Sequence, residues 1–387
     1  MRTFLLTSLP LLLIVGCSPS SSVASGNDSA EAQTTSASDR PFTVRELAKF
    51  DEPWAMTFIP TTGQALITEK KGRLMLWSGD GRASEVAGVP QVDYGNQGGL
   101  GDVVLHPDFA NNGFIYLSWA EAGEGDTRGA AVGRGRLVLA GDTARIDDLK
   151  VIWRQDRKVT GRGHYGHRIA FSPDGYLFIS SGERQKFDPA QDMQQNLGKI
   201  VRLTDAGGIP SDNPHYGTTP VQAQVWTSGH RNPLGIAFDA EGRLWEHEMG
   251  PRGGDEVNLI VKGRNYGYPI VSNGDHYDGK DIPDHPTRPE FEAPKVWWNP
   301  SISPAGMIVY SGDKFPAWRG DILMGALSGQ ALIRIDLDGE TARKADQWDM
   351  GQRIREVEQG PDGSVYLLED EDKGTGGRLL KLVPASR

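Results

Sequence analysis

Residues 167–182, "HRIAFSPDGYLFISSG", contain the pattern that decides the fold. A short apolar run at 169–171 is followed by the turn residues Ser-Pro-Asp-Gly and then by a second apolar run at 176–179. Two such runs around a Pro-Asp-Gly turn predict two antiparallel strands joined by a tight turn. No stretch of the chain shows a convincing helical period of apolar residues over about three turns, so strands dominate the prediction.

The same strand–turn–strand pattern occurs five more times along the chain. The other copies are "WAMTFIPTTGQALIT" (54–68), "GDVVLHPDFANNGFIYLS" (101–118), "LGIAFDAEGRLWEHEMG" (234–250), "AGMIVYSGDKFPAWRGDILMG" (305–325) and "IREVEQGPDGSVYLLEDE" (354–371). Six copies in about 346 residues correspond to roughly 58 residues a copy. Repeats of about 40–50 residues with four strands each are typical of β-propellers, and the surplus here would form loops. We therefore predict an all-β protein, a six-bladed β-propeller with four-stranded antiparallel blades. The alternative is a β-sandwich whose hairpins resemble one another by chance.

Polar residues recur just before the first strand of several copies. His164, Arg231, Gln97 and Arg353 all lie eight to ten residues before the turn of their copy. In a propeller the innermost strand of each blade lines the central channel, so the loops that lead into these strands meet at one end of the axis. We expect these four side chains to converge there, with His167 as a structural or rim residue.

The residue types in this ring indicate a possible chemistry. A histidine with a near-neutral pKa is the usual general base. Arg353 and Arg355 are two apart and share one face of a strand, and with Arg231 they would form a pocket for carboxylates. The alternative is an arginine pair that forms only a structural ion pair.

A second pattern is the turn "GPRGGDE", residues 250–256. Its glycines leave backbone carbonyls exposed, and Asp255 and Glu256 follow at once. Carbonyl and carboxylate oxygens are the ligands that calcium prefers. Together with the arginines, this turn predicts a polyanionic cofactor bridged by calcium, although each pattern alone also fits an ordinary turn or ion pair.

Several long motifs give the chain a specific resemblance that covers nearly everything after Pro41. They are "NQGGLGDVVLHPDF", "GHYGHRIAFSPDGYLF", "DPAQDMQQNLGKIVRL", "SGHRNPLGIAF", "EMGPRGGDEVN", "GQRIREVEQGPDGSVYLL" and "GRLLKL". With these motifs in this order, the chain resembles the pyrroloquinoline quinone (PQQ)-dependent aldose sugar dehydrogenases, relatives of soluble glucose dehydrogenase, which are six-bladed propellers. The resemblance implies calcium-dependent oxidation of an aldose at C1 to a lactone, by hydride transfer to the quinone.

The resemblance also implies roles for individual residues. His164 matches the general base that takes the proton of the sugar C1 hydroxyl, and Arg231 matches a catalytic residue at the reactive carbonyl edge of the quinone. The cofactor-binding residues that the resemblance implies are Gln97, Arg231, Asn232, Arg353 and Arg355.

Two metal sites are implied in the same way. The backbone carbonyls of Gly250 and Pro251 match those that hold the catalytic calcium, which acts as a Lewis acid. Glu256 and Tyr266 resemble ligands of a second, structural calcium.

The chain departs from the family at one position. Relatives carry a lysine near the cofactor in sequences such as "GALKGQ", whereas this chain has Ser328 in "GALSGQ". Loss of one charge-assisted hydrogen bond would cost about 1.5–3 kcal/mol if nothing replaced it. This departure keeps open a second function, a non-enzymatic, lipid-anchored propeller scaffold. A third function, a calcium-dependent sugar lactonase, also fits a six-bladed propeller.

The first 40 residues are expected to lie outside the fold. Residues 1–16 read as a lipoprotein signal peptide with a short apolar run, and Cys17, the only cysteine, lies where lipoproteins are lipidated. Of residues 18–39, 14 are Ser, Thr or Ala, so we expect 17–40 to be a flexible tether and 41–387 to be the catalytic propeller. We expect the protein on the periplasmic side, anchored by lipid to a bacterial membrane, and Ser18 is compatible with the outer membrane.

Composition constrains the partners. The formal net charge is −10 and the chain has no basic run, which argues against nucleic acid as a partner. The expected partners are an aldose substrate and an electron acceptor that the sequence does not identify. No apolar surface stripe predicts an oligomer, so we expect a monomer.

Overall fold

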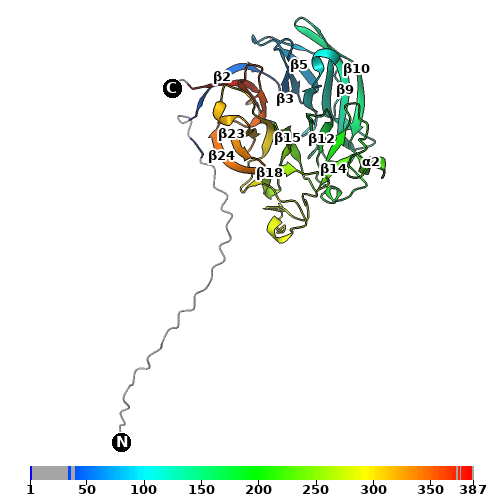
Figure 1. Ribbon diagram of the computed structural model, residues 1–387, viewed down its shortest axis with the longest axis vertical. Helices are drawn as coiled ribbons and strands as arrows, with labels where there is room; N and C mark the ends of the chain where they lie inside the picture. The colour runs from blue at the N-terminus through cyan, green and yellow to red at the C-terminus, as the bar shows by residue number, and fades with distance from the viewer. Residues whose placement is uncertain (2–33, 36–39, 372–373, 375, 386–387) are drawn as a thin grey trace.

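The computed structural model describes residue 1 and residues 34–35, 40–371, 374 and 376–385. Cys17 and nearly all of the predicted signal peptide and tether lie outside these residues. The described chain forms six four-stranded antiparallel blades in a ring, so the predicted six-bladed β-propeller is confirmed (Figure 1). Among the described residues, no helix has both the length and the apolar character needed to cross a bilayer.

The first three blades follow the chain in order. The first comprises β3 (Pro53–Phe58), β4 (Ala65–Glu69), β5 (Arg73–Trp77) and β6 (Ala83–Glu85). The second comprises β7 (Leu100–Leu105), β8 (Phe114–Ala122), β9 (Arg128–Ala140) and β10 (Thr143–Arg154). The third comprises β11 (Gly166–Phe171), β12 (Leu177–Ser181), β13 (Lys199–Leu203) and β14 (Val225–Ser228).

The other three blades include the two ends of the fold. The fourth comprises β15 (Pro233–Phe238), β16 (Leu244–Glu248), β18 (Asp255–Ile260) and β20 (Val296–Trp298). The fifth comprises β21 (Pro304–Val309), β22 (Ile322–Ala326), β23 (Ala331–Asp338) and β24 (Thr341–Asp349), with β1 (Thr34–Thr35) added at its edge. The sixth comprises β25 (Ile354–Gln359), β26 (Val365–Glu369), β27 (Arg378–Pro384) and β2 (Phe42–Lys49).

Short elements fill the loops between strands. They are β17 (Arg252–Gly253), which pairs with β19 (Gly274–Asp275), the α-helices α1 (Phe109–Asn112) and α2 (Pro220–Ala223), and the 3-10 helices η2 (Asp188–Ala190), η3 (His285–Thr287) and η4 (Pro316–Trp318).

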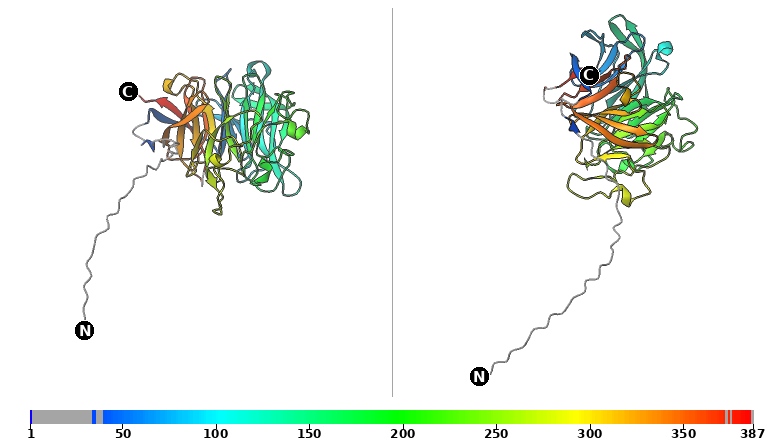
Figure 2. Two further views of the ribbon diagram at one scale, coloured as in Figure 1. Left: turned by 60° about the horizontal axis from the view of Figure 1, so that its bottom comes forward. Right: turned by 60° about the vertical axis from the view of Figure 1, so that its left-hand side comes forward.

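The ring closes by joining the two ends of the described chain. β2, from the N-terminal side, pairs antiparallel with β27, from Phe42 opposite Pro384 to Lys49 opposite Arg378. In Figure 2 the first blue strand lies beside the red C-terminal strand. This pairing leaves no open end in the ring, which stabilises a propeller because its blades otherwise hold together only through side-chain packing.

The six innermost strands share one construction. Each has six residues, is largely buried over its first four and half-buried at its end, and has a break in register with the second strand near its start. A bulge of this kind turns side chains away from the regular alternation. The start of each inner strand therefore presents its residues to one mouth of the central channel.

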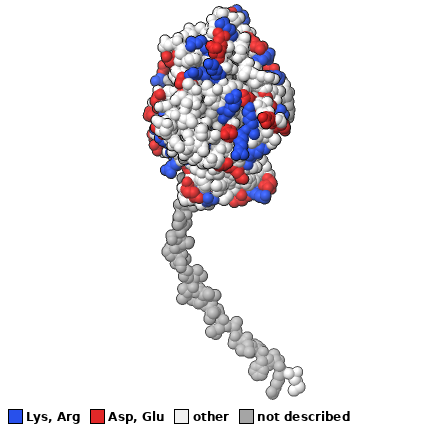
Figure 3. Space-filling view, turned by 90° about the vertical axis from the view of Figure 1, so that its right-hand side faces the viewer, with Lys and Arg blue, Asp and Glu red and all other residues white. Residues whose placement is uncertain are grey.

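Apolar side chains from neighbouring blades pack against one another between the blades. Between the fifth and sixth blades, Phe42 packs edge-on against Trp318 and Trp348, with ring centroids 6.0 and 5.3 Å apart. On the outer face in Figure 3, Lys and Arg side chains lie interspersed with Asp and Glu. The polar residues predicted to form the site lie instead near the mouth of the channel.

Candidate active site

Two neighbouring cavities open at the mouth of the channel. The large cavity has a volume of about 430 Å³ and is lined by residues from all six blades, among them Trp54, Gln97, Tyr165, Leu234, Ser303 and Arg355. The small cavity has a volume of about 290 Å³ and contains His164, Arg231, Pro251 and Tyr268. The two share a wall, because Gln97 of the large cavity binds the backbone of His164 and Met249 of the large cavity binds Arg231.

His164 lies in the small cavity with its orientation fixed at two points. Its backbone N–H donates to Oε1 of Gln97 at 2.7 Å, which supports the left-handed backbone of His164 at φ +50°. Its ring Nδ1 lies against the carboxylate of Glu183. A carboxylate at Nδ1 favours the tautomer with the proton there, so Nε2 is the free acceptor.

Glu183 is a functional candidate that the sequence reasoning missed. It lies two residues after the end of β12, and besides contacting His164 it accepts the backbone N–H groups of Lys186 and Phe187. Burial raises its pKa, but the hydrogen bond and charge of His164 outweigh burial, and the net pKa lies below the usual value. It is therefore a carboxylate at neutral pH.

The pKa of His164 lies below its ordinary value because burial disfavours the charged ring, an effect that Glu183 opposes and Arg231 reinforces. A base must be neutral to accept a proton, so we expect activity to persist into mildly acidic solution and to fall only below the ordinary histidine pKa.

In Glu183→Gln the negative charge that raises the pKa of His164 is removed, so the pKa of His164 falls further. The acid limb of the kcat/KM profile should then move to lower pH, while the plateau falls roughly tenfold to hundredfold because the base is weaker.

The matched control for this prediction is Glu121→Gln, which removes a carboxylate paired with Arg154 and Lys158 outside both cavities. Its pH profile should match that of the unmodified protein. An acid limb in Glu183→Gln that stays in place or moves to higher pH would contradict the assignment of His164 as the base.

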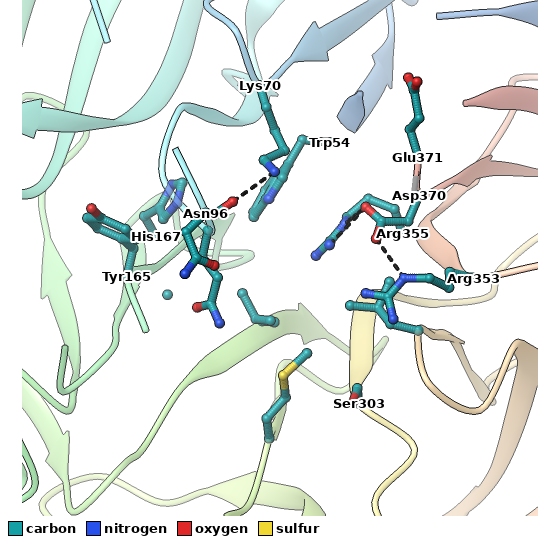
Figure 4. Close-up of a pocket in the computed structure, with 15 residues that line it drawn as sticks. Trp54, Lys70, Asn96, Tyr165, His167, Ser303, Arg353, Arg355, Asp370 and Glu371 are labelled. Carbon is teal, nitrogen blue, oxygen red and sulfur yellow. Dashed lines mark hydrogen bonds and ion pairs between the residues drawn. The ribbon is translucent and has the colours of Figure 1, made fainter. Parts of the chain in front are cut away.

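One wall of the large cavity is cationic (Figure 4). Arg353 and Arg355 share Asp370, with Nε–Oδ2 and Nε–Oδ1 distances of 2.9 and 3.0 Å. Arg231 was expected beside them, but it lines the small cavity instead. The third cation in the large cavity is Lys70, which the sequence reasoning did not identify.

Arg231 and Asn232 are held by one carboxylate. Glu248 accepts the backbone N–H groups of both, and its other oxygen lies 3.2 Å from Nδ1 of His230. The Arg231 guanidinium donates from Nη1 to the carbonyl of Met249 at 2.9 Å. Asn232 is buried, and its Oδ1 accepts the N–H of Gly166. Because Gly166 lines the large cavity, Asn232 supports the wall of that cavity.

His167 is a buried residue that lines the large cavity. It is buried, its Nδ1 lies 2.7 Å from Oγ of Ser118, and its ring stacks on Trp54 with centroids 5.1 Å apart. Burial lowers its pKa to about 3, so it is neutral. A Cβ at position 101 would lie 1.9 Å from the His167 ring, so Gly101 makes room for this stack.

The turn at 250–254 lies between the two cavities. Gly253 and Gly254 have φ values of +86° and +70°, which favour glycine, and the carbonyls of Gly250 and Pro251 accept no hydrogen bond from the described residues. Asp255 is engaged separately from Glu256, because its oxygens accept the backbone N–H groups of Gly250, Ile302 and Ser303. This arrangement leaves the two carbonyls available to a cation.

Glu256 lies in a buried acidic cluster with Glu246, Glu248 and Asn258. Burial and mutual repulsion raise the pKa values of Glu246 and Glu256 well above their usual range, and Glu246 Oε1 and Asn258 Oδ1 have no hydrogen-bond partner among the described residues. Buried oxygens without partners fit a hard cation. The Tyr266 hydroxyl donates to the carbonyl of Leu259 and accepts the N–H of Val261, whereas its backbone carbonyl accepts no hydrogen bond from the described residues.

Ser328, at the position of the family lysine, is hydrogen-bonded at the rim. Its Oγ lies 2.8 Å from Oγ of Ser303 and 3.3 Å from the carbonyl of Ser301. Ser303 itself lines the large cavity. The rim here is therefore neutral.

Comparison with known proteins gives one consistent result. The family model of Glucose / Sorbosone dehydrogenase matches residues 50–381. Aldose sugar dehydrogenase YliI of Escherichia coli (strain K12) is 42% identical over 344 residues, which span 87% of this chain and 91% of that protein. A crystal structure of glucose dehydrogenase is 45% identical, with a TM-score of 0.83 over 89% of this chain and 100% of that one. The PQQ-bound form of the aldose sugar dehydrogenase of Streptomyces coelicolor is 27% identical, with a TM-score of 0.71 over 88% of this chain and 98% of that one.

Proposed function

The chain belongs to the Glucose / Sorbosone dehydrogenase family and is an oxidoreductase, and we propose that it oxidises aldose sugars at C1 to lactones with PQQ and calcium. The observation that carries this proposal is the pairing of His164 with Glu183 in the small cavity, directly beside the cationic wall of the large cavity. One cavity thus offers a base, and its neighbour offers cations for an acidic cofactor.

The residues of the large cavity fit PQQ. This cofactor is a flat, fused-ring ortho-quinone with three carboxylates, and Arg353 and Arg355 present guanidinium groups that suit carboxylates. The indole of Trp54 lines the cavity and is held in place by the ring of His167 and the guanidinium of Arg168. A relative solved in its PQQ-bound form supports the same cofactor here.

Calcium fits the carbonyls of Gly250 and Pro251 on the wall between the cavities. When bound, PQQ would supply the two-electron acceptor for the hydride of C1, and calcium would supply a Lewis acid. A second, structural calcium fits the buried oxygens of Glu246, Glu256 and Asn258.

In this reaction the protein itself removes the proton of the C1 hydroxyl and orients the groups that react. Nε2 of His164 takes the proton of the C1 hydroxyl, and Glu183 at Nδ1 orients the ring and stabilises the imidazolium that forms. Arg231 lies in the same small cavity, where its guanidinium attracts negative charge that develops on the substrate oxygen. Lactone formation then needs no further group from the chain.

The small cavity has the apolar surface that a sugar ring requires. Phe187, Tyr268, His276 and Tyr277 line it, and Phe187 and Tyr277 are 45% and 73% exposed. Aromatic faces bind the apolar faces of pyranose rings, while polar groups between them bind the hydroxyls. His276 and Tyr277 belong to the 273–291 loop, which therefore contributes to substrate selection.

The location is part of the proposal. Lipidation at Cys17 would hold a monomeric enzyme on the periplasmic side of a bacterial membrane, where its substrate and electron acceptor would be small molecules or proteins of that compartment.

The test is spectroscopic. The purified protein is stripped of metal with a chelator, supplied with calcium and PQQ, and its quinone absorption is recorded before and after addition of a panel of aldoses. The proposal expects quinone binding that depends on calcium and reduction of the bound quinone by at least one aldose. If no quinone binds with calcium in excess, the proposed function fails, and hydrolysis of a sugar lactone would identify a lactonase instead.

A further inference from the structure

The large cavity contains a cation that no role yet explains. We propose that Lys70 binds an anionic group of the cofactor from the opposite side of the cavity to Ser328, and so supplies the cationic contact that the rim lacks. This inference rests on the proposed function, because it takes the occupant of the cavity to be PQQ.

The backbone of Lys70 is held rigidly between two blades. It follows β4 directly, its N–H donates to the carbonyl of Glu52 at 3.0 Å, and its carbonyl accepts the N–H of Leu100 at 2.9 Å. A Cβ on Gly99 would lie 2.1 Å from the carbonyl oxygen of Lys70, and Gly99 has φ +144°, so only glycine allows this close approach. The side chain therefore starts from a fixed point on the cavity wall.

The ammonium of Lys70 is only partly satisfied by the protein. Nζ donates to the backbone carbonyl of Asn96 at 2.9 Å, and among the described residues no carboxylate lies within ion-pair distance of it. Its neighbour Lys71 is different, since it pairs with Asp51 at 2.9 Å and with Glu52 at 3.9 Å. An ammonium has three donors, so Lys70 retains hydrogen-bonding capacity for a ligand.

The charges around Lys70 favour an anion. Burial lowers its pKa, and the charge of Arg355 in the same cavity lowers it further. The charges of Glu52 and Asp370 oppose this lowering, but Asp370 is already shared by Arg353 and Arg355. Lys70, Arg353 and Arg355 therefore face a cavity whose two carboxylates, Asp370 and Glu371, already have partners. An anion that enters this cavity would form charge-assisted hydrogen bonds with the cations.

Lys70 and the serine rim lie on different sides of the cavity. Figure 4 shows Lys70 at one end of the drawn residues and Ser303, the hydrogen-bonded neighbour of Ser328, at the other. A cation from the first blade thus faces the occupant from the side opposite the neutral serines of the fifth blade.

The experiment measures cofactor affinity and not turnover. Isothermal titration calorimetry with PQQ in the presence of calcium gives the Kd of the unmodified protein, Lys70→Met, Lys70→Arg and the matched control Lys71→Met. We expect Lys70→Met to raise the Kd about tenfold to a hundredfold, Lys70→Arg to stay within a few-fold, and Lys71→Met to leave the Kd unchanged.

Thermal unfolding of each variant shows whether the fold is retained, and Lys70→Arg keeps the test valid if the methionine variant unfolds. Tight binding by the unmodified protein together with an unchanged Kd in Lys70→Met would overturn this inference and leave the proposed function intact. Absence of PQQ binding in the unmodified protein would instead overturn the proposed function, and this inference with it.

Discussion

Replacement of His164 by asparagine should lower kcat for aldose oxidation by about 100- to 10,000-fold while PQQ stays bound. His164 is the only residue of the small cavity whose ring nitrogen is backed by a buried carboxylate among the described residues, so its loss removes the base and leaves the binding groups in place. A general base contributes typically 10²- to 10⁴-fold to a rate. Single-turnover reduction of the bound quinone by an aldose measures the chemical step directly.

The contrast with the second histidine makes this prediction specific. His167→Asn should weaken the stack on Trp54 and lower thermal stability or PQQ affinity, because His167 lines the large cavity and is bonded to Ser118. It should not abolish proton removal. If His164→Asn kept near-normal oxidation while His167→Asn lost it, the assignment of the base would be wrong.

The second large effect is expected at the cationic wall. A triple variant, Arg353→Met, Arg355→Met and Asp370→Asn, should raise the Kd for PQQ by about 100- to 10,000-fold, since two charge-assisted contacts of about 1.5–3 kcal/mol each are lost. Asp370 is changed with the arginines because it is buried, and an unpaired buried carboxylate would destabilise the fold by itself. Calorimetric titration with PQQ in calcium is the measurement.

Arg343→Met is the control for charge removal. Arg343 pairs with Asp336 on the exposed outer part of the fifth blade, far from the channel mouth in the fold, and its loss should leave the Kd unchanged. An unaltered Kd in the triple variant, with the fold intact, would show that the cofactor is not held by this wall.

The sequence predicted correctly those features that depend on residues close together in the chain. The hairpin at 167–182 and its five relatives fixed the strands, because a short apolar run, a turn and a second run leave the backbone few alternatives. Six such units in one chain can bury their faces only by stacking around an axis, so the propeller followed. The loops before the inner strands were correctly expected at one mouth of the channel, and Gln97 does contact His164 there.

The sequence did not predict which cavity each polar side chain faces. Counting residues back from the turns placed Arg231 with Arg353 and Arg355, but the bulge at the start of each inner strand turns neighbouring side chains to different cavities. Asp255 and Glu256 are adjacent in sequence, and the strand alternation sends one to backbone N–H groups and the other to a buried acidic cluster. The Tyr266 hydroxyl is used by backbone groups of its own blade.

The sequence by itself determined the all-β class, the six repeats, the position of the mouth loops and the family motifs, since these depend on local pattern and spacing. Only the tertiary structure decided which polar groups face one another. Glu183 and Lys70 lie at the ends of second strands, where nothing in the local pattern marks a polar residue as part of a site. Glu183 and Lys70 become part of the site because the ring brings strand ends from different blades together. Contacts between residues far apart in the chain cannot be read from the spacing of residues within one repeat.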